Sequence, residues 1–237
     1  MRLLVTRPLP DALETAERAR ALGHEALVQP LLTIVFAPAP RDVPEPAAIL
    51  VTSRNALRAL QSWPQMPGWL RTPMFVTGAA TARDAEALGF ADVREGGGDA
   101  ASIARAVQAG LASGAGPLLY PAARDRTGAL AEVLTAAGHA VLTVEAYRAA
   151  AAVRLDQAVR TALAEGTLDG VLLYSRRTAE AFRTLATKAG LGDRLGTPTT
   201  YVLSEQVAAA LAGTGARVEW PAQPDEESLF RLIGPAR

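Results

Sequence analysis

The chain has 237 residues, with 24 basic and 24 acidic side chains and no cysteine. Zero formal charge provides no long-range attraction to nucleic acid or to an anionic membrane, and the lack of cysteine excludes disulfides, thiolate nucleophiles and cysteine metal sites. No stretch approaches the roughly 20 apolar residues of a membrane span, and the apolar run at the N-terminus is too short for a signal peptide. We therefore expect a cytoplasmic protein without nucleic-acid or membrane partners.

Predicted strands and helices alternate from the first residues to the last. Strands are expected at 3–5, 25–36, 48–52, 73–77, 90–94, 117–120, 140–148, 168–174, 199–203 and 216–220, and helices at 11–22, 54–61, 79–88, from Asp99 onward, and at 126–137, 154–164, 176–189, 205–212 and 225–233. Apolar strands that alternate with helices are typical of parallel sheets covered by helices and joined by right-handed crossovers. The sequence thus predicts the α/β class.

Two segments interrupt this alternation. Pro30 breaks the extended stretch 25–36, and residues 37–46 contain four prolines, which suit neither a helix nor an inner strand. Residues near 31–46 are therefore the first candidate boundary. A second possible connection lies at 149–153.

The chain also repeats itself. Four segments reappear later in the same order, namely 22–28 as 137–143, 49–57 as 171–179, 75–82 as 201–208, and 99–105 as 225–231. In the second of these pairs, Ser175 takes the place of Ser53. One half of the chain is therefore interpreted as a diverged copy of the other, which favours two domains.

Polar or small residues follow the expected strands at Thr6, Ser53, Gly78, Ser175 and Ser204. In open parallel sheets, ligands bind beyond the carboxyl ends of the strands. The helix that starts near Ser53 adds unpaired amides and the positive end of its dipole, which suit a carboxylate or a phosphate. The alternative is that Ser53 or Asn55 only caps its own helix.

Other chemistry is limited by what the chain lacks. His24 and His139 are the only histidines, and each follows a glycine that ends a helix, so a loop role is favoured over a serine hydrolase or a zinc site. No P-loop occurs, and no G-x-G-x-x-G follows the first strand. The glycines at 96–98 suit either a phosphate or a flexible loop. What remains is an anion-binding protein whose acid–base chemistry uses neither His nor Cys.

Five ordered motifs resemble the uroporphyrinogen-III synthase family. They are Val5–Pro8, Gln29–Ile34, Val51–Ala56, Val76–Gly78 with Thr81–Ala82, and Val144–Arg148. The resemblance implies two flavodoxin-like, doubly wound parallel-sheet domains joined by two extended connectors. One domain would comprise 1–34 with 150–237 and the other 37–147, with connectors near 31–38 and 144–151.

The resemblance also implies a reaction, the cyclisation of hydroxymethylbilane to uroporphyrinogen III. The last pyrrole ring is inverted and water is lost, without a cofactor or a metal. The polycarboxylate substrate would bind in a cleft between the domains, and the protein's part would be to orient the chain ends and assist departure of the hydroxyl. The implied partners are this small molecule and, transiently, the preceding enzyme of the pathway, and we expect a monomer.

Site residues follow from the same resemblance. Tyr147 matches the family's tyrosine on the returning connector and is assigned the role of assisting the leaving hydroxyl, with packing at the hinge as the alternative. The residues expected to meet substrate carboxylates are Thr6, Arg7, Ser53, Asn55, Gly78, Thr81, Arg126, Ser175 and Ser204, of which Arg7 and Arg126 are placed at helix starts. The second Gly-x-x-Thr-Ala motif departs from the family, since Ser204 and Val207 replace its glycine and threonine.

Two other functions fit the sequence features less well. A non-catalytic two-lobed sensor would close on a carboxylated ligand through the same strand ends. A glycosyltransferase-like enzyme would need a nucleotide-sugar site, for which the chain has no convincing acidic or glycine signature.

Overall fold

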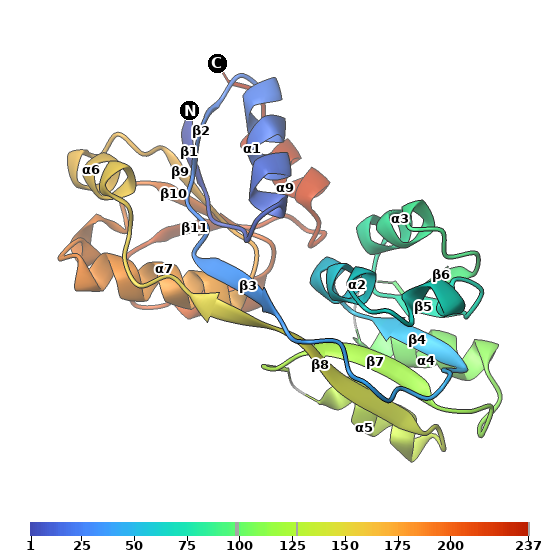
Figure 1. Cartoon of the computed structure of the whole chain (residues 1–237). Helices are drawn as coiled ribbons and strands as arrows, with labels where there is room; N and C mark the ends of the chain where they lie inside the picture. Colours follow the sequence, from blue (N-terminus) through green and yellow to red (C-terminus); the bar gives the residue numbers. More distant parts are fainter. Residues whose placement is uncertain (98–99, 127, 237) are drawn as a thin grey trace. The chain divides into compact units, whose positions relative to one another are not determined.

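A computed structural model describes residues 1–97, 100–126 and 128–236 of the chain (Figure 1). The chain divides into two compact units, here called unit 1, Met1–Thr33 with Ala150–Arg237, and unit 2, Ile34–Ala149. Gly98 and Asp99, where the sequence places the end of the glycine run and the start of a helix, lie outside the described residues. Each unit is an α/β structure in its own right.

Unit 1 contains a five-stranded sheet in the order β11-β10-β9-β1-β2, and its neighbouring strands pair in parallel. This is the flavodoxin order. The strands are β1 Arg2–Val5, β2 Glu25–Val28, β9 Gly170–Leu173, β10 Thr199–Val202 and β11 Arg217–Glu219. The helices are α1 Asp11–Ala21, α6 Gln157–Glu165, α7 Arg176–Lys188, α8 Glu205–Ala208 and α9 Glu226–Ile233, with short 3-10 helices at Gly192–Arg194 and Ala209–Leu211.

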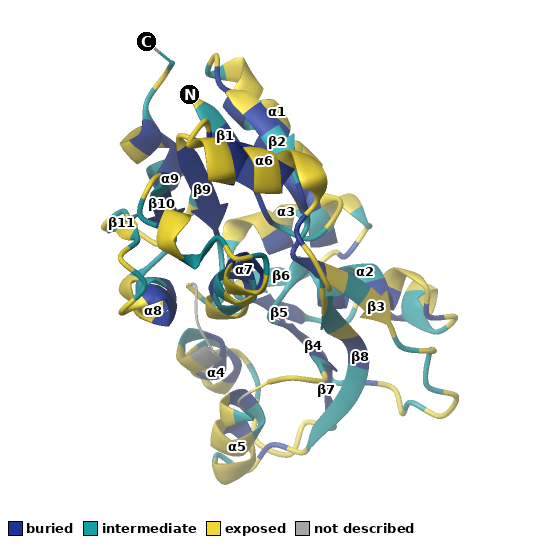
Figure 2. Ribbon diagram, turned by 90° about the vertical axis from the view of Figure 1, so that its left-hand side faces the viewer, coloured by how far each residue is buried: buried dark blue, intermediate teal, exposed yellow. Residues whose placement is uncertain are grey.

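Helices cover both faces of this sheet because its central strands are apolar on both sides. Leu4 and Val171 pack with residues of α6 and α7, whereas Leu3 and Leu172 pack on the opposite face with residues of α1 and α9. Successive strand residues point to opposite faces, so continuous apolar strands need a helical layer on each side. In Figure 2 the central strands are accordingly buried, whereas the helices expose their outer sides.

Unit 2 contains a six-stranded sheet in the order β3-β8-β7-β4-β5-β6, and the pairs from β8 to β6 are parallel. The strands are β3 Leu32–Phe36, β4 Ala48–Val51, β5 Met74–Val76, β6 Val93–Glu95, β7 Leu118–Ala123 and β8 Val141–Ala151. The helices are α2 Arg54–Gln61, α3 Ala79–Ala87, α4 Ala100–Gly110 and α5 Ala129–Ala136, with a 3-10 helix at Met66–Trp69. The predicted α/β class with two parallel sheets is confirmed.

Strands that the sequence repeat matches occupy matching places in the two sheets. The neighbours β11-β10-β9 of unit 1 correspond to β6-β5-β4 of unit 2, and β1-β2 correspond to β7-β8. The turns agree as well, because Gly23 and Gly138 have φ values of +85° and +86°, and His24 and His139 after them are each 4% exposed. The chain enters unit 1 at β1, whereas it enters unit 2 at the edge strand β3 and continues with β4. That the two units descend from one ancestral unit stays a prediction. The matching strand order is what such a duplication would produce.

Three expected helices differ clearly in their bounds, and the one predicted from residue 154 begins at Gln157. The helix predicted from residue 126 begins at Ala129, because Gly128 before it has a left-handed conformation with φ of +77°. The helix predicted at 205–212 is α8 followed by a 3-10 helix from Ala209. Among the described residues, none of the helices is long and apolar enough to cross a membrane.

Gly170 provides a test of packing in unit 1. It lies in β9 between β1 and β10, and a Cβ atom there would be 2.6 Å from Leu3 Cδ2 and 3.0 Å from Tyr201 Cε2. Gly170→Ala should therefore lower the free energy of unfolding by about 1 to 3 kcal/mol, as overpacking does. Urea denaturation measures this change. Gly68→Ala is the control, since a Cβ atom there meets nothing within 4 Å, and equal stability of the two variants would contradict the prediction.

Candidate functional site

The predicted site residues of unit 2 lie near the carboxyl ends of adjacent strands. Ser53 follows β4, Gly78 follows β5, and Tyr147 lies in the second half of β8. Because β5, β4, β7 and β8 are neighbours and run in parallel, their carboxyl ends share one edge of the sheet. The fold therefore brings these residues to the edge at which such sheets bind ligands.

Two helices begin at this edge, and they differ in how they are capped. Ser53 has an extended backbone, and its hydroxyl accepts a hydrogen bond of 3.2 Å from the Asn55 amide, so it does cap α2. Gly78 begins α3 without a side-chain cap, and a Cβ atom there would meet nothing within 4 Å. The N-terminus of α3 is thus unobstructed, and the amides at a helix start attract anions.

The other expected binding residues near these helices are partly engaged. The Asn55 side-chain oxygen accepts a hydrogen bond of 2.8 Å from Arg58. Thr81 is only 6% exposed, and its amide donates to the Gly78 carbonyl within the first turn of α3. Thr81 therefore packs inside the unit and holds the turn between β5 and α3.

Tyr147 is aimed by a β-bulge. Ala122 pairs with Glu145 but Ala123 pairs with Tyr147, so Ala146 is an extra residue on β8. Consecutive strand residues normally point to opposite faces, yet Ala146 and Tyr147 both pack into the cluster formed with α2. Bulges re-aim side chains and occur beside active sites. The bulge thus directs Tyr147 toward the turn between β4 and α2, and we call such a turn from a strand into a helix a corner.

The hydroxyl of Tyr147 lies in a buried, hydroxyl-rich setting. Burial raises the pKa of its phenol above the usual value, a hydrogen bond with Ser53 lowers it, and nearby Tyr120 raises it, with a net increase. The phenol is therefore protonated at neutral pH and can donate a proton. Tyr120, whose hydroxyl lies 3.3 Å from Thr52 Oγ1, was not among the residues expected from sequence. The only sequence signal for it is its place at the end of the predicted strand 117–120.

Arginines gather where β7 and β8 end. Arg124 binds both carboxylate oxygens of Glu145 at 3.0 Å, and the positive charges of Arg126 and Arg148 also lower the pKa of that carboxyl. Arg126 is exposed, and its guanidinium donates to the Ala123 carbonyl at 2.9 Å. It precedes α5 by three residues rather than starting it, which corrects the expected placement at a helix start.

The matching corners of unit 1 lie at Ser175 and Ser204, after β9 and β10. The Ser175 hydroxyl accepts a hydrogen bond of 3.1 Å from the Thr178 amide and caps α7. Ser204 has the same extended backbone as Gly78 and provides no side-chain cap. Val207 is 6% exposed, as Thr81 is. The departures from the family motif therefore fit the same backbone, because the replaced positions need neither a left-handed conformation nor an exposed hydroxyl.

Thr6 and Arg7, which follow β1, are engaged within unit 1. Thr6 is fully buried, and its hydroxyl donates to the Leu172 carbonyl at 2.6 Å. Arg7 donates to Glu226 at 3.0 Å and to Asp11 at 3.2 Å. Its guanidinium lies 4.5 Å from the centre of the Tyr174 ring, and α1 begins only at Asp11, so Arg7 does not start a helix as expected.

Glu226 is the centre of this network. Its Oε1 accepts hydrogen bonds from Tyr174 at 2.7 Å and from Thr15 at 2.6 Å, besides the one from Arg7. Burial raises the pKa of Tyr174 well above its usual value of 10.0, and the negative charge of Glu226 adds to the increase. The network joins β1, β9, α1 and α9, and it occupies Arg7 with charges from the protein itself.

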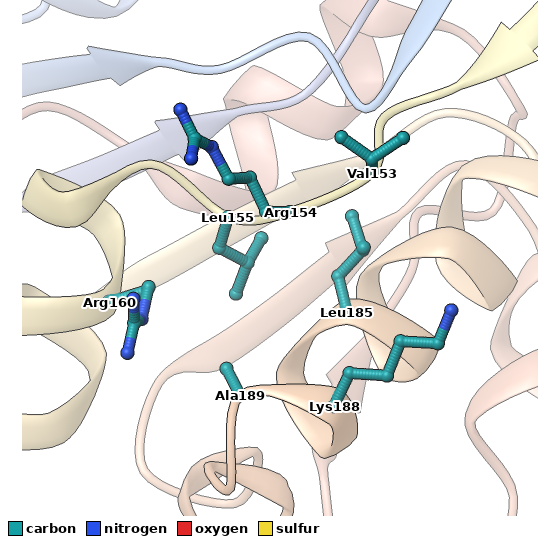
Figure 3. Close-up of a pocket in the computed structure, with 7 residues that line it drawn as sticks. All are labelled: Val153, Arg154, Leu155, Arg160, Leu185, Lys188 and Ala189. Atoms are coloured by element: carbon teal, nitrogen blue, oxygen red, sulfur yellow. The ribbon is translucent and has the colours of Figure 1, made fainter.

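Unit 1 also contains a pocket of about 220 Å³ (Figure 3). Its lining consists of Val153, Arg154, Leu155, Arg160, Leu185, Lys188 and Ala189. In Figure 3 the charged ends of Arg154, Arg160 and Lys188 lie on separate sides of the pocket. Ligand sites have polar groups that converge on one place, so this pocket does not form a single anion site.

The buried Tyr174 predicts an alkaline limit to stability. Below the ordinary tyrosine pKa of about 10, the residue is protonated in both folded and unfolded chains, and its contribution is fully present. Above it, the unfolded chain loses the proton while the folded chain retains it, so stability falls as pH rises. Urea denaturation from about pH 8 to about pH 11 should therefore give a steeper loss for the natural chain than for Tyr174→Phe. Equal slopes would rule out this assignment.

The chain resembles known proteins in both sequence and fold. The family model described as uroporphyrinogen-III synthase HemD matches residues 14–231. The crystal structure of uroporphyrinogen-III synthetase from Helicobacter pylori 26695 is similar, with a TM-score of 0.66 and 17% identity over 98% of this chain and 97% of that chain. A mutant uroporphyrinogen III synthase from the extremely thermophilic bacterium Thermus thermophilus gives a TM-score of 0.61 and 19% identity over 98% and 97%.

The two structural likenesses show the fold. No match was found among curated protein sequences. The family model, however, covers most of the chain and includes β4, β9, the bulged strand β8 and the helices that begin at the site. The chain belongs to the uroporphyrinogen-III synthase family.

Proposed function

We propose that this protein cyclises hydroxymethylbilane to uroporphyrinogen III in tetrapyrrole biosynthesis, with inversion of the last pyrrole ring and loss of water. The observation that carries the proposal is the family match over residues 14–231. No feature of the described residues favours a non-catalytic sensor. The buried, protonated phenol of Tyr147 in unit 2 and the helix starts at the strand ends of each unit support the proposal.

In this proposal Tyr147 is the general acid. Its buried phenol gives a proton to the departing hydroxyl of the substrate, which leaves as water, and an electron-rich pyrrole supplies the attacking carbon. Burial keeps the phenol protonated beforehand, whereas the hydrogen bond with Ser53 stabilises the phenolate that remains. The proton that the ring carbon loses after attack restores the phenol. The two opposing effects on the Tyr147 pKa thus serve the two halves of one proton cycle.

Substrate carboxylates would be bound by amides at the helix starts after Ser53, Gly78, Ser175 and Ser204. The support is the extended backbone at each of these positions and the absence of a side-chain cap at Gly78 and Ser204. Helix N-termini bind anions through such amides. Arg126 adds an exposed guanidinium in unit 2.

We further propose that the protein acts as a cytoplasmic monomer and receives its unstable substrate by transient contact with the preceding enzyme. The lack of cysteine suits a reducing compartment. The zero formal charge gives no reason to expect recruitment to a membrane surface.

Freshly generated hydroxymethylbilane tests the activity directly. The natural chain should convert it to the type III isomer, whereas the type I isomer forms spontaneously. Tyr147→Phe should lower kcat by about 100-fold or more and leave KM nearly unchanged, because it removes the donated proton but not the carboxylate contacts. Isomer analysis and steady-state rates measure both effects. Type I product alone from the natural chain would reject the function, and an unchanged kcat would reject the role of Tyr147.

Arg126 offers a separate test of carboxylate binding. Arg126→Gln should raise KM by about fivefold with little effect on kcat, since it removes one charge-assisted contact at an exposed position. Arg231→Gln is the matched control, because Arg231 is also an exposed arginine. It lies in the last turn of α9 and pairs with Glu227 of the first turn. The same rise in KM for both variants would indicate a general charge effect and contradict a specific contact.

A further inference from the structure

Tyr120 is a buried tyrosine on β7 with no assigned role. It is 6% exposed, and its ring packs with residues of α4 and α5 on one face of the sheet of unit 2. Its hydroxyl lies 3.3 Å from Thr52 Oγ1, at the end of the neighbouring strand β4. A buried tyrosine hydroxyl normally finds a partner, and the partner here is the residue directly before Ser53.

Tyr147 reaches the same corner from the other face of the sheet. Its ring belongs to the cluster formed with α2, and the nearby Ser53 hydroxyl lowers the pKa of its phenol. Ser53 also accepts a hydrogen bond from the Asn55 amide. Thr52 and Ser53 are adjacent, so the two tyrosines hold two consecutive residues of the turn between β4 and α2 from opposite sides.

We propose that Tyr120 is a positioning residue for the synthase reaction, because its hydroxyl fixes Thr52 and thereby keeps the Ser53 hydroxyl directed at Tyr147. This inference rests on the proposed function, in which Tyr147 donates a proton. An active site needs its acid held in place by a second set of contacts. Tyr120 supplies such a contact without touching the substrate.

The matching corner of unit 1 lacks this arrangement. There the residue before the capping Ser175 is Tyr174, in the place that Thr52 has in unit 2. The Tyr174 hydroxyl donates to Glu226 instead, within the network that contains Arg7. The Tyr120–Thr52 contact therefore belongs to the unit that contains Tyr147 and is not a general feature of the turn.

Tyr120→Phe is the primary test, since it retains the packed ring and removes only the hydroxyl. It should lower kcat about fivefold, the effect of losing one neutral hydrogen bond, with KM unchanged and only a small fall in the urea midpoint. Thr52→Val should give the same loss, and Thr52→Ser, which retains a hydroxyl, should restore the natural rate. Tyr201→Phe, a buried strand tyrosine of unit 1, is the control and should leave kcat unchanged.

Coupling to Tyr147 separates positioning from a purely structural role. In a Tyr147→Phe background, Tyr120→Phe should have no further effect on kcat, because the hydroxyl that it positions is gone. The same fivefold loss in both backgrounds would overturn the proposal. An unchanged kcat for Tyr120→Phe would overturn it as well.

A spectroscopic readout keeps the proposal testable if the protein makes no type III isomer. In protein labelled with 13C at tyrosine Cζ, the Tyr147 signal is assigned as the one that Tyr147→Phe removes. That signal should shift in Tyr120→Phe and in Thr52→Val but not in Tyr201→Phe. An unmoved signal would overturn the positioning role, whereas absence of type III product with a shifted signal would reject the proposed reaction alone.

Discussion

The parallel direction of the strands is the constraint on which the rest of this structure depends. In each unit every central strand ends at the same edge of its sheet, and the next helix begins there with its amides unpaired by the helix itself. Polar residues after β4, β5, β9 and β10 therefore gather at sheet edges although they are far apart in sequence. The flanking helices are required by the strands, which are apolar on both faces. Helix starts gathered at one sheet edge therefore follow from the packing of the core rather than from any single motif.

Within unit 2, one irregularity of β8 directs Tyr147 to this edge. The extra residue Ala146 breaks the alternation of β8, so Tyr147 turns to the α2 side and meets Ser53. Burial and the serine hydroxyl act on the pKa of the phenol in opposite directions, and the proposed proton cycle uses both effects. Tyr120 contacts the same turn from the opposite face through Thr52.

The two units share a sheet order and differ in what fills their corners. In unit 1 the end of β1 is occupied by an internal network in which Glu226 accepts hydrogen bonds from Arg7, Thr15 and Tyr174. Both units have an uncapped helix start, at Ser204 and at Gly78, and unit 2 adds the hydroxyls around Tyr147. The two units thus have similar frames, and in the proposed mechanism the proton donor belongs to unit 2.

The sequence by itself determined the α/β class, the parallel sheets and a helix start near Ser53, because alternating apolar segments and the residues that begin a helix act over a few positions. Tertiary structure decided the rest. The ion pair between Arg7 and Glu226 joins residues 219 positions apart, the bulge at Ala146 exists only against β7, and Tyr120 meets Thr52 only because β7 and β4 are neighbours. Such contacts depend on strand order and register, which are set by packing of the whole unit and leave no local pattern in the chain.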